Sequence, residues 1–354
     1  MFLSIIIPIY NDEMYIRECL DSCLNQDIPA GDYEIICVDD GSTDSTPQIL
    51  KEYSSKYSNV HVMLMPHAGG GRRNDGLAVA KGDYIWFVDH DDVVAQNVMK
   101  LIKETADEGK YDRITFPHSI FTSSIPQKTS DLNPSNLRDA VTWTSVIRKD
   151  FLSQHNIRPR SHRLDGIKMY YSVDSFFVYE CKLNGAKEAN IGDRPFYYHR
   201  KHSGSETANF HTPEGLLKQA ESDALITRFV MDDYKKAINP SYPTADIVMS
   251  WARSVATSVA TLPKQTYRQG IEIMREEGLL PLSPLPECDF TLLKCIKAKN
   301  HKGPIKSILY FYSTTNWGLP LYRMSFVKIH LSRFARKNML VSNILDYKNK
   351  VLRR

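Results

Sequence analysis

The stretch that decides the fold is Tyr84-Ile85-Trp86-Phe87-Val88-Asp89-His90-Asp91-Asp92. Its first five residues are apolar and predict a buried strand, and the next four carry three carboxylates. Carboxylates grouped at the carboxyl end of such a strand repel one another and lose hydration, and a bound cation would relieve both penalties. Ligands of open α/β sheets bind at these strand ends. The alternative is a solvated acidic turn that opens the next helix, because acidic residues suit helix N-termini.

The segments around this stretch alternate between strand and helix patterns. Residues 3–9 form a continuous apolar run, as expected of a strand covered on both faces. Further strands are predicted at residues 33–38 and 60–65, and helices at 15–24, from Ser45 or Thr46 onward, at 73–80 and at 95–108. This rhythm predicts an α/β fold with a mostly parallel sheet flanked by helices.

The rest of the chain is less regular and becomes helical. Strands are expected at residues 113–117, 141–147 and 195–200, and helices at 174–183, 216–234, 245–262 and 264–277. We predict one domain over residues 1–212, with a first half at 1–93 and a second half at 94–212. A mainly helical C-terminal region is predicted over residues 213–354, with a proline-rich break at 281–286.

Composition narrows the class of protein. Hydrophobic residues make up 42% and charged residues 24% of the chain, which is ordinary for a globular protein. No apolar stretch reaches the roughly 18 residues of a membrane-spanning helix. Six cysteines are too sparse for a disulfide framework, so we expect a cytoplasmic protein.

Charge is distributed unevenly along the chain. Residues 289–354 hold 14 lysines and arginines against two acidic residues, whereas the whole chain has a net charge of +4. Apolar and basic residues interleave over residues 326–340, as in a helix that lies on a membrane surface. We therefore expect the basic segment to make a peripheral contact with the anionic inner face of the cell membrane. The alternative is that it forms an ordinary basic helix on the protein surface. Nucleic acid is not expected as a partner, because no nucleic-acid-binding motif is present.

Polar clusters follow four successive predicted strands and can converge on one crevice. They are residues 8–12, 39–44, 69–74 and 89–92. The third cluster is a run of three glycines before two arginines, which would let backbone N–H groups and guanidinium groups approach phosphate. It lacks the GxxxxGK[ST] and GxGxxG patterns. A nucleotide ligand is therefore suggested, and kinases, GTPases and dehydrogenases are disfavoured.

Five stretches occur in the order and at nearly the spacing of a known family. They are residues 4–11 (SIIIPIYN), 36–44 (ICVDDGSTD), 73–77 (RNDGL), 80–84 (AKGDY) and 87–92 (FVDHDD). Over residues 1 to about 205 the chain resembles the family 2 glycosyltransferases with the Rossmann-like GT-A fold. The resemblance implies an inverting transferase that moves a sugar from a UDP-sugar donor to a hydroxyl of a glycan or lipid-linked glycan in surface polysaccharide biosynthesis.

The resemblance also implies roles for residues of the first half. Pro8, Tyr10, Asn11 and Asp39 would bind the nucleotide, with the Asp39 carboxylate facing a ring N–H of uracil, and Arg73 would lie near the nucleotide or diphosphate. Asp89 and Asp91 would form the DxD motif, which contacts the donor and binds Mn²⁺ or Mg²⁺ between the diphosphate oxygens. Asp92 would serve instead or cap the following helix. For Asp40 and Asp44 we favour turn-forming and capping roles.

An inverting transfer needs a base that takes the proton of the acceptor hydroxyl. The family supplies it from a Glu-Asp pair that opens a helix, and here the pair is Val173-Asp174. Asp174 fits the base or a helix cap, two compatible roles. Val173 departs from the family pattern and puts acceptor positioning in doubt.

Two further segments resemble known parts of the family. His199 and Arg200, in the strand expected at residues 195–200, would close over the diphosphate. Trp143 lies where acceptor sites begin, although we favour a core position. The glycine tract, with Gly71 and Arg72 in place of the usual Ser and Ala, is a second departure from the family. Together with Val173 it motivates the alternative of a non-catalytic nucleotide-sugar-binding subunit.

Overall fold

The computed structural model describes residues 1–122, 141–160, 173–202 and 212–236, together with three helical residues, Gln269, Ile273 and Glu276. The helix expected at 245–262, the proline-rich break at 281–286 and the basic segment at 289–354 lie outside the described residues. The membrane contact therefore stays a prediction. Among the helices described, none has the length and apolar character needed to cross a membrane.

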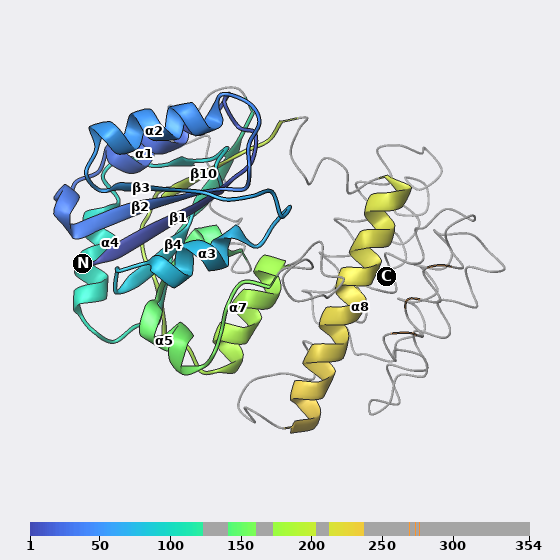
Figure 1. Cartoon of the computed structure of the whole chain (residues 1–354). Coiled ribbons are helices and arrows are strands. Elements are labelled where there is room, and N and C mark those ends of the chain that lie inside the picture. Colours follow the sequence, from blue (N-terminus) through green and yellow to red (C-terminus); the bar gives the residue numbers. More distant parts are fainter. Residues whose placement is uncertain are drawn as a thin grey trace, which may run out of the picture.

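The main sheet has seven strands in the order β3-β2-β1-β4-β8-β6-β9 (Figure 1). The first four strands pair in parallel, and β8 runs antiparallel to both of its neighbours. The mostly parallel sheet predicted from the sequence is therefore confirmed. The strands are β1 (Leu3–Ile9), β2 (Tyr33–Asp39), β3 (Val60–Leu64), β4 (Tyr84–Phe87), β6 (Arg113–Thr115), β8 (Ser145–Arg148) and β9 (Glu188–Asn190).

Helices cover both faces of this sheet, which explains why its central strands are mostly apolar and almost fully buried. Side chains of β1 alternate between two hydrophobic clusters: Ile5 and Ile7 join one, and Ile6 joins the other. The first cluster contains residues of α1 (Ile16–Leu24), α2 (Thr46–Lys56) and α4 (Met99–Asp107). The second lies against α3 (Arg72–Val79), α5 (Lys149–Gln154) and α7 (Val173–Leu183). A short 3-10 helix, η1 (Ala30–Asp32), precedes β2.

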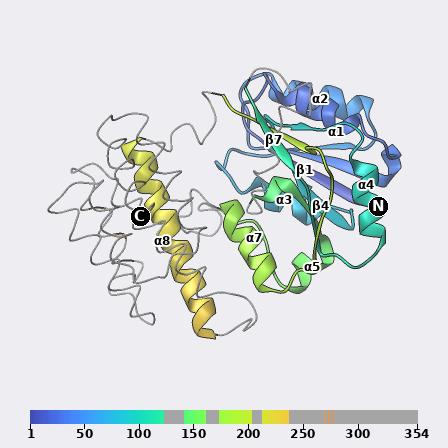
Figure 2. The ribbon, with the colours of Figure 1, turned by 180° about the vertical axis from the view of Figure 1, so that it is seen from behind.

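A second, three-stranded sheet has the order β5-β10-β7. Its strand β7 is labelled in Figure 2, which shows the molecule from behind. Its strands are β5 (Val93–Val94), β10 (Tyr197–Arg200) and β7 (His118–Phe121). β5 follows the acidic tetrapeptide directly and pairs antiparallel with β10. The small sheet thus ties the end of β4 to the second half of the chain.

The helix expected at residues 95–108 begins later, at Met99. Residues 93 and 94 belong to β5, and the backbone N–H of Ala95 donates to the carbonyl of Phe196. Asn97 has a φ of 56°, which no residue inside a right-handed helix adopts. Pairing with β10 therefore overrides the helical pattern of these residues.

The strand expected at residues 141–147 is also only partly correct. Residues Thr142–Thr144 form a 3-10 helix, η3, and the strand β8 begins at Ser145. Strands β7 and β9 were not predicted, because each is only three or four residues long. Short strands carry too few alternations to stand out in a sequence.

Helix α8 (Pro213–Lys236) lies beside α7, and both views show this (Figures 1 and 2). The rings of Phe176 and Phe229 stack at 5.6 Å, and the Tyr179 hydroxyl hydrogen-bonds to Asp233 Oδ2 at 3.2 Å. The predicted boundary between residues 212 and 213 coincides with the start of α8, and the division into two domains stays a prediction.

Substituting Gly82 with alanine is expected to destabilise the protein by about 1–3 kcal/mol, the usual range for overpacking. A Cβ at Gly82 would lie 2.4 Å from the backbone N of Ser4 and 2.5 Å from the carbonyl carbon of Leu3. Backbone atoms of the central strand β1 cannot move away cheaply. Gly31→Ala is the matched control, because nothing lies within 4 Å of its Cβ position. Urea unfolding measures both variants, and equal midpoints would contradict the expectation.

Candidate active site

The acidic tetrapeptide leaves the carboxyl end of β4, and each of its carboxylates has a different partner. Asp89 Oδ1 accepts a hydrogen bond of 2.6 Å from Arg73 Nη2. Asp91 Oδ2 lies 2.9 Å from His202 Nε2. Both side chains are partly exposed, Asp89 at 27% and Asp91 at 14%. These are the carboxylates that a ligand can reach.

Asp92 is fully buried and is used by the small sheet. Its carboxylate accepts hydrogen bonds from the Tyr197 hydroxyl (2.7 Å) and the Arg200 backbone N–H (2.7 Å), and it lies 3.1 Å from His199 Nδ1. Burial raises the pKa of Asp92, although His199 opposes the rise. The next helix begins only at Met99, so Asp92 does not cap it. Its role here is to hold β10 against the acidic turn.

Arg73 joins the acidic turn to the predicted base. Its guanidinium donates to Asp89 through Nη2, and Nη1 lies 3.6 Å from Asp174 Oδ1. Burial would lower the pKa of Arg73, but Asp174 and Asp89 outweigh burial and raise it, so this side chain stays cationic. Asp174 Oδ1 also accepts a 2.7 Å hydrogen bond from Thr142 Oγ1. The fold therefore brings Asp89, Arg73 and Asp174 together from three separate segments.

Asp39, predicted to bind the nucleobase, lies at the end of β2. It is 2% exposed, and its Oδ2 accepts the backbone N–H of Ser42 at 3.0 Å. Its Oδ1 is buried and has no hydrogen-bond partner. An unpaired buried acceptor is costly, and a ring N–H of a ligand would satisfy it.

Tyr10 and Pro8 lie on the adjacent strand β1 or directly after it. Pro8 is half-buried, whereas Tyr10 is 43% exposed and stacks on the ring of His67 at 4.4 Å. One face of an exposed tyrosine ring backed by a second ring is a suitable platform for a base. Contact of Pro8 and Tyr10 with a nucleotide stays a prediction.

Asn11 connects two of the strand-end clusters. It adopts a φ of 48°, and its Oδ1 accepts the backbone N–H of Thr43 at 2.7 Å. Its own backbone N–H donates to Ser42 Oγ at 2.8 Å. The side chain thus shapes the turn that follows Asp39, and a direct nucleotide contact would require Asn11 to exchange these bonds. Asp44 Oδ1 accepts the N–H of Thr46, the first residue of α2, at 3.0 Å, although Ser45 occupies the N-cap position.

The glycine tract differs from the expectation that its backbone N–H groups approach phosphate. The Asp40 carboxylate accepts the N–H groups of Gly69 (2.7 Å) and Gly70 (3.3 Å), and also that of Ala68 (2.8 Å). Arg72 Nε donates to Asp40 at 2.6 Å. Burial would raise the pKa of Asp40, but these hydrogen bonds outweigh it and lower the pKa. The carboxylate therefore takes the place that the sequence analysis assigned to phosphate.

His199 and Arg200 both hold the acidic turn in this structure. Arg200 is only 6% exposed, and its guanidinium lies over the rings of Tyr15 (4.6 Å) and Phe121 (4.4 Å). Its Nε donates to the backbone carbonyl of Asp91 at 2.8 Å, and it pairs with Glu18. A contact of His199 or Arg200 with the diphosphate would require these bonds to be exchanged, and it stays a prediction.

Trp143 occupies the core, as favoured by the sequence analysis. It is 7% exposed and stacks on Tyr197 at 4.7 Å and on His199 at 5.2 Å. Tyr197 itself was missed: its hydroxyl donates to Asp92 and accepts the backbone N–H of Asp89 at 3.0 Å. Only its place in an aromatic strand next to His199 could have indicated this role.

His90 was also missed as a partner of the first strand-end cluster. Its Nδ1 lies 3.0 Å from Asp12 Oδ2, an ion pair without good hydrogen-bond alignment. Burial alone would lower the pKa of His90, but Asp12 and the charges of Asp91 and Asp89 outweigh it and raise the pKa to about 9. His90 is therefore cationic at neutral pH and offsets part of the charge of the acidic turn.

The His90 ion pair predicts that stability falls as the pH rises to about 9. The folded state binds the proton more tightly than the unfolded state, whose histidine has its ordinary pKa of about 6.5. The stabilisation is complete below that pH and is lost as the pH rises through about 9. We expect the wild type to lose about 1–2 kcal/mol more than His90→Gln between pH 6.5 and 9.5. Urea unfolding of both proteins measures this, and parallel pH curves would contradict it.

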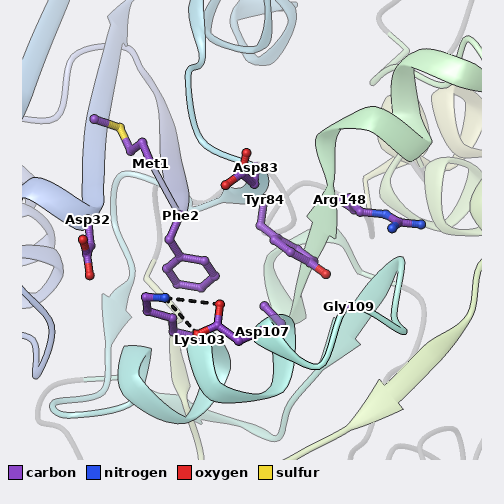
Figure 3. Close-up of a pocket in the computed structure, with 10 residues that line it drawn as sticks. Met1, Phe2, Asp32, Asp83, Tyr84, Lys103, Asp107, Gly109 and Arg148 are labelled. Atoms are coloured by element: carbon purple, nitrogen blue, oxygen red, sulfur yellow. Dashed lines mark hydrogen bonds and ion pairs between the residues drawn. The ribbon is translucent and has the colours of Figure 1, made fainter.

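A cavity of about 390 Å³ lies at the opposite end of the sheet (Figure 3). Phe2 and Tyr84, at the amino ends of β1 and β4, line it together with Asp83, Lys103 and Arg148. The candidate active site follows the carboxyl ends of the same strands, where ligands of parallel sheets bind. The cavity therefore does not belong to the candidate site.

The candidate site offers few protein ligands for a metal ion. No group of three histidine, cysteine, aspartate or glutamate residues suited to a metal occurs in the part of the chain that the structure describes. Asp91 and His202 offer one carboxylate and one imidazole, 2.9 Å apart. Divalent ions that act on diphosphates need only one or two protein ligands, because phosphate oxygens and waters complete the shell. The residues present fit an ion of that kind.

Comparison with known proteins identifies the family. The model of "Glycosyl transferase family 2" matches residues 4–183. The chain belongs to this family. Every residue of the Asp89–Arg73–Asp174 cluster lies within the matched range, as do all strands of the main sheet except β9 and the first residue of β1.

Curated relatives of this family 2 member are named as glycosyltransferases, and two of them as transferases of poly(ribitol-phosphate). A poly(ribitol-phosphate) beta-glucosyltransferase of Bacillus spizizenii is 35% identical over 67% of this chain and 38% of its own length. The poly(ribitol-phosphate) beta-N-acetylglucosaminyltransferase TarS of Staphylococcus aureus is 30% identical over 65% of this chain and 44% of its own length. EpsJ of Bacillus subtilis, an uncharacterized glycosyltransferase, is 38% identical over 62% of this chain and 68% of its own. The chain spans less than half of the first two relatives.

Solved structures show the same fold. Residues 1–349 of S. aureus TarS, in complex with UDP-GlcNAc, match with a TM-score of 0.61 at 24% identity, over 88% of this chain and 89% of that one. The mannosyltransferase PcManGT of Pyrobaculum calidifontis, with GDP-Man and Mn²⁺, matches with a TM-score of 0.50 at 13% identity, over 90% of this chain and 88% of that one. The predicted GT-A fold and family are therefore confirmed.

Proposed function

We propose that this family 2 member is an inverting transferase that moves a sugar from a UDP-sugar to a hydroxyl of a glycan or lipid-linked glycan of a surface polysaccharide. The observation that carries the proposal is the placement of Arg73 between Asp89 and Asp174. It puts a donor-binding carboxylate and a candidate base on two sides of one cation. The names of the two poly(ribitol-phosphate) transferases and the UDP-GlcNAc complex of TarS support this class of acceptor and donor.

The residues supply distinct parts of the transfer. Asp39 Oδ1 accepts a ring N–H of uracil, because it is buried and unpaired. Asp174 takes the proton of the acceptor hydroxyl as the hydroxyl attacks the anomeric carbon from the face opposite the diphosphate. Arg73 lies 3.6 Å from Asp174 and close enough to Asp89 to share the charge of the diphosphate.

A divalent ion, Mn²⁺ or Mg²⁺, would be held by Asp91, with Asp89 and His202 beside it. Such an ion supplies Lewis-acid stabilisation of the leaving UDP when bound. His202 Nε2 contacts Asp91 Oδ2 at 2.9 Å, so binding of the ion by both side chains would require this contact to be exchanged. The ion does not take the proton or orient the acceptor. Protein residues that lie on the other side of Arg73 from the ion do both.

A donor screen tests the proposal. The purified chain is incubated with Mn²⁺ or Mg²⁺, a panel of UDP-sugars and a polyol-phosphate polymer, and UDP release and the anomeric configuration of the product are measured. We expect UDP release that depends on the acceptor, with inversion at the anomeric carbon. UDP binding by calorimetry without turnover across the panel would instead support a non-catalytic nucleotide-sugar-binding subunit.

A further inference from the structure

The 3-10 helix η3 (Thr142–Thr144) is buried beside the candidate base and is held firmly. The Trp143 carbonyl accepts the indole N–H of Trp86, a fully buried residue of β4, at 2.9 Å. The Trp143 ring stacks on Tyr197 and His199, which both contact Asp92. Through these contacts η3 is anchored to β4 and to the acidic turn.

The two threonines of η3 use their hydroxyls differently. Thr144 Oγ1 donates within its own turn, to the carbonyl of Val141 at 2.9 Å. Thr142 Oγ1 instead donates across to α7, to Asp174 Oδ1 at 2.7 Å. Thr142 is only 1% exposed, so its hydroxyl has no water to replace this bond. The bond is therefore a directional contact between η3 and the candidate base.

Both contacts of Asp174 in the described part of the chain engage the same oxygen. Thr142 and Arg73 approach Oδ1, at 2.7 Å and 3.6 Å, and neither contact involves Oδ2. A hydrogen bond to one carboxylate oxygen restricts the rotamers of the side chain, and the second oxygen remains able to accept a proton. The side chain of Asp174 is 25% exposed, so an acceptor can reach it.

We propose that Thr142 is the positioning residue of the base: its hydroxyl fixes the rotamer of Asp174 so that Oδ2 faces the acceptor hydroxyl. The inference rests on the proposed function, because it assumes that Asp174 is the base. Since η3 is also anchored to β4 and the acidic turn, the same element sets the base relative to the donor site. General-base catalysis depends on such placement, and a displacement of about 1 Å lowers a rate by about 100-fold.

A purely structural role for Thr142 is the competing explanation. Asp174 lies in the first turn of α7, so the hydroxyl could merely stabilise the start of that helix. A structural role predicts loss of stability without a selective loss of turnover. The positioning role predicts a lower kcat with an unchanged KM for the donor, because the Thr142 hydroxyl donates to Asp174 and, within the described residues, to none of those proposed to bind UDP.

The experiment compares three variants of the full chain in the transfer assay. Thr142→Val removes the hydroxyl at constant shape, Thr142→Ser keeps it, and Thr144→Val removes the neighbouring hydroxyl that contacts only its own turn. For Thr142→Val we expect kcat to fall about 10- to 100-fold, with the donor KM within about twofold of wild type. Thr142→Ser should recover most of the rate, and Thr144→Val should keep it.

Two results would overturn the inference: wild-type kcat in Thr142→Val, or an equal loss of kcat in Thr144→Val. If Thr142→Val does not fold, Thr142→Ala takes its place with the same expectations. Asp174→Asn separates this inference from the proposed function. Full turnover in Asp174→Asn would refute the base itself, whereas an inactive Asp174→Asn with a normal Thr142→Val would refute only the role of Thr142.

Discussion

Replacement of Asp174 by asparagine is expected to lower the rate of sugar transfer by about three orders of magnitude while UDP-sugar binding survives. General-base catalysis contributes about 10²- to 10⁴-fold, and the amide cannot accept the proton of the acceptor hydroxyl. The side chain keeps its shape and an oxygen for Thr142 Oγ1, so the start of α7 should remain folded. Transfer is measured by UDP release, and donor binding by calorimetry.

Asp150→Asn is the matched control for this substitution. Asp150 also lies in the first turn of a helix, α5, but it is exposed and outside the Asp89–Arg73–Asp174 cluster. The Asp150→Asn protein should transfer sugar at the wild-type rate. If Asp174→Asn loses donor binding and transfer to the same degree, Asp174 stabilises the site and does not act as the base.

The second large effect is expected from Asp91→Ala. This carboxylate is the proposed metal ligand, and without it the charge of the leaving UDP is poorly neutralised, so transfer should fall by about 100-fold or more. The backbone carbonyl that accepts the Arg200 Nε hydrogen bond is retained, so the turn should keep its anchor to β10. Transfer is titrated with Mn²⁺ or Mg²⁺, and binding of the ion with UDP is measured independently by calorimetry.

Asp107→Ala serves as the control, because it removes one carboxylate from the surface of α4, where Asp107 is 63% exposed and paired with Lys103. The Asp107→Ala protein should show the same dependence of sugar transfer on Mn²⁺ or Mg²⁺ as the wild type. An Asp91→Ala protein that still transfers sugar with the metal dependence of the wild type would refute Asp91 as a ligand. Asp89 would then become the remaining candidate.

The order of strands and helices in the first half was readable from the sequence because each element there is long and locally consistent. Residues 3–9 and 33–39 are mostly apolar strands, and the helix after each of them carries apolar residues at helical spacing. Parallel order then follows from the alternation. The second half was less predictable: β7 and β9 are too short for a periodic signal, and the start of α4 is decided by pairing of β5 with β10.

Sequence patterns also indicated the residues of the candidate site, because acidic residues at strand ends and an aspartate that opens a helix are local features. The patterns did not indicate which role each of those residues has. Asp89, Asp91 and Asp92 are adjacent in the chain, yet one pairs with Arg73, one with His202, and one is buried under β10. Those partners lie 16 to 111 residues away in sequence. Residue type and spacing therefore established the candidate site, whereas long-range packing decided which carboxylate faces a ligand, since burial and hydrogen-bond partners exist only once distant segments meet.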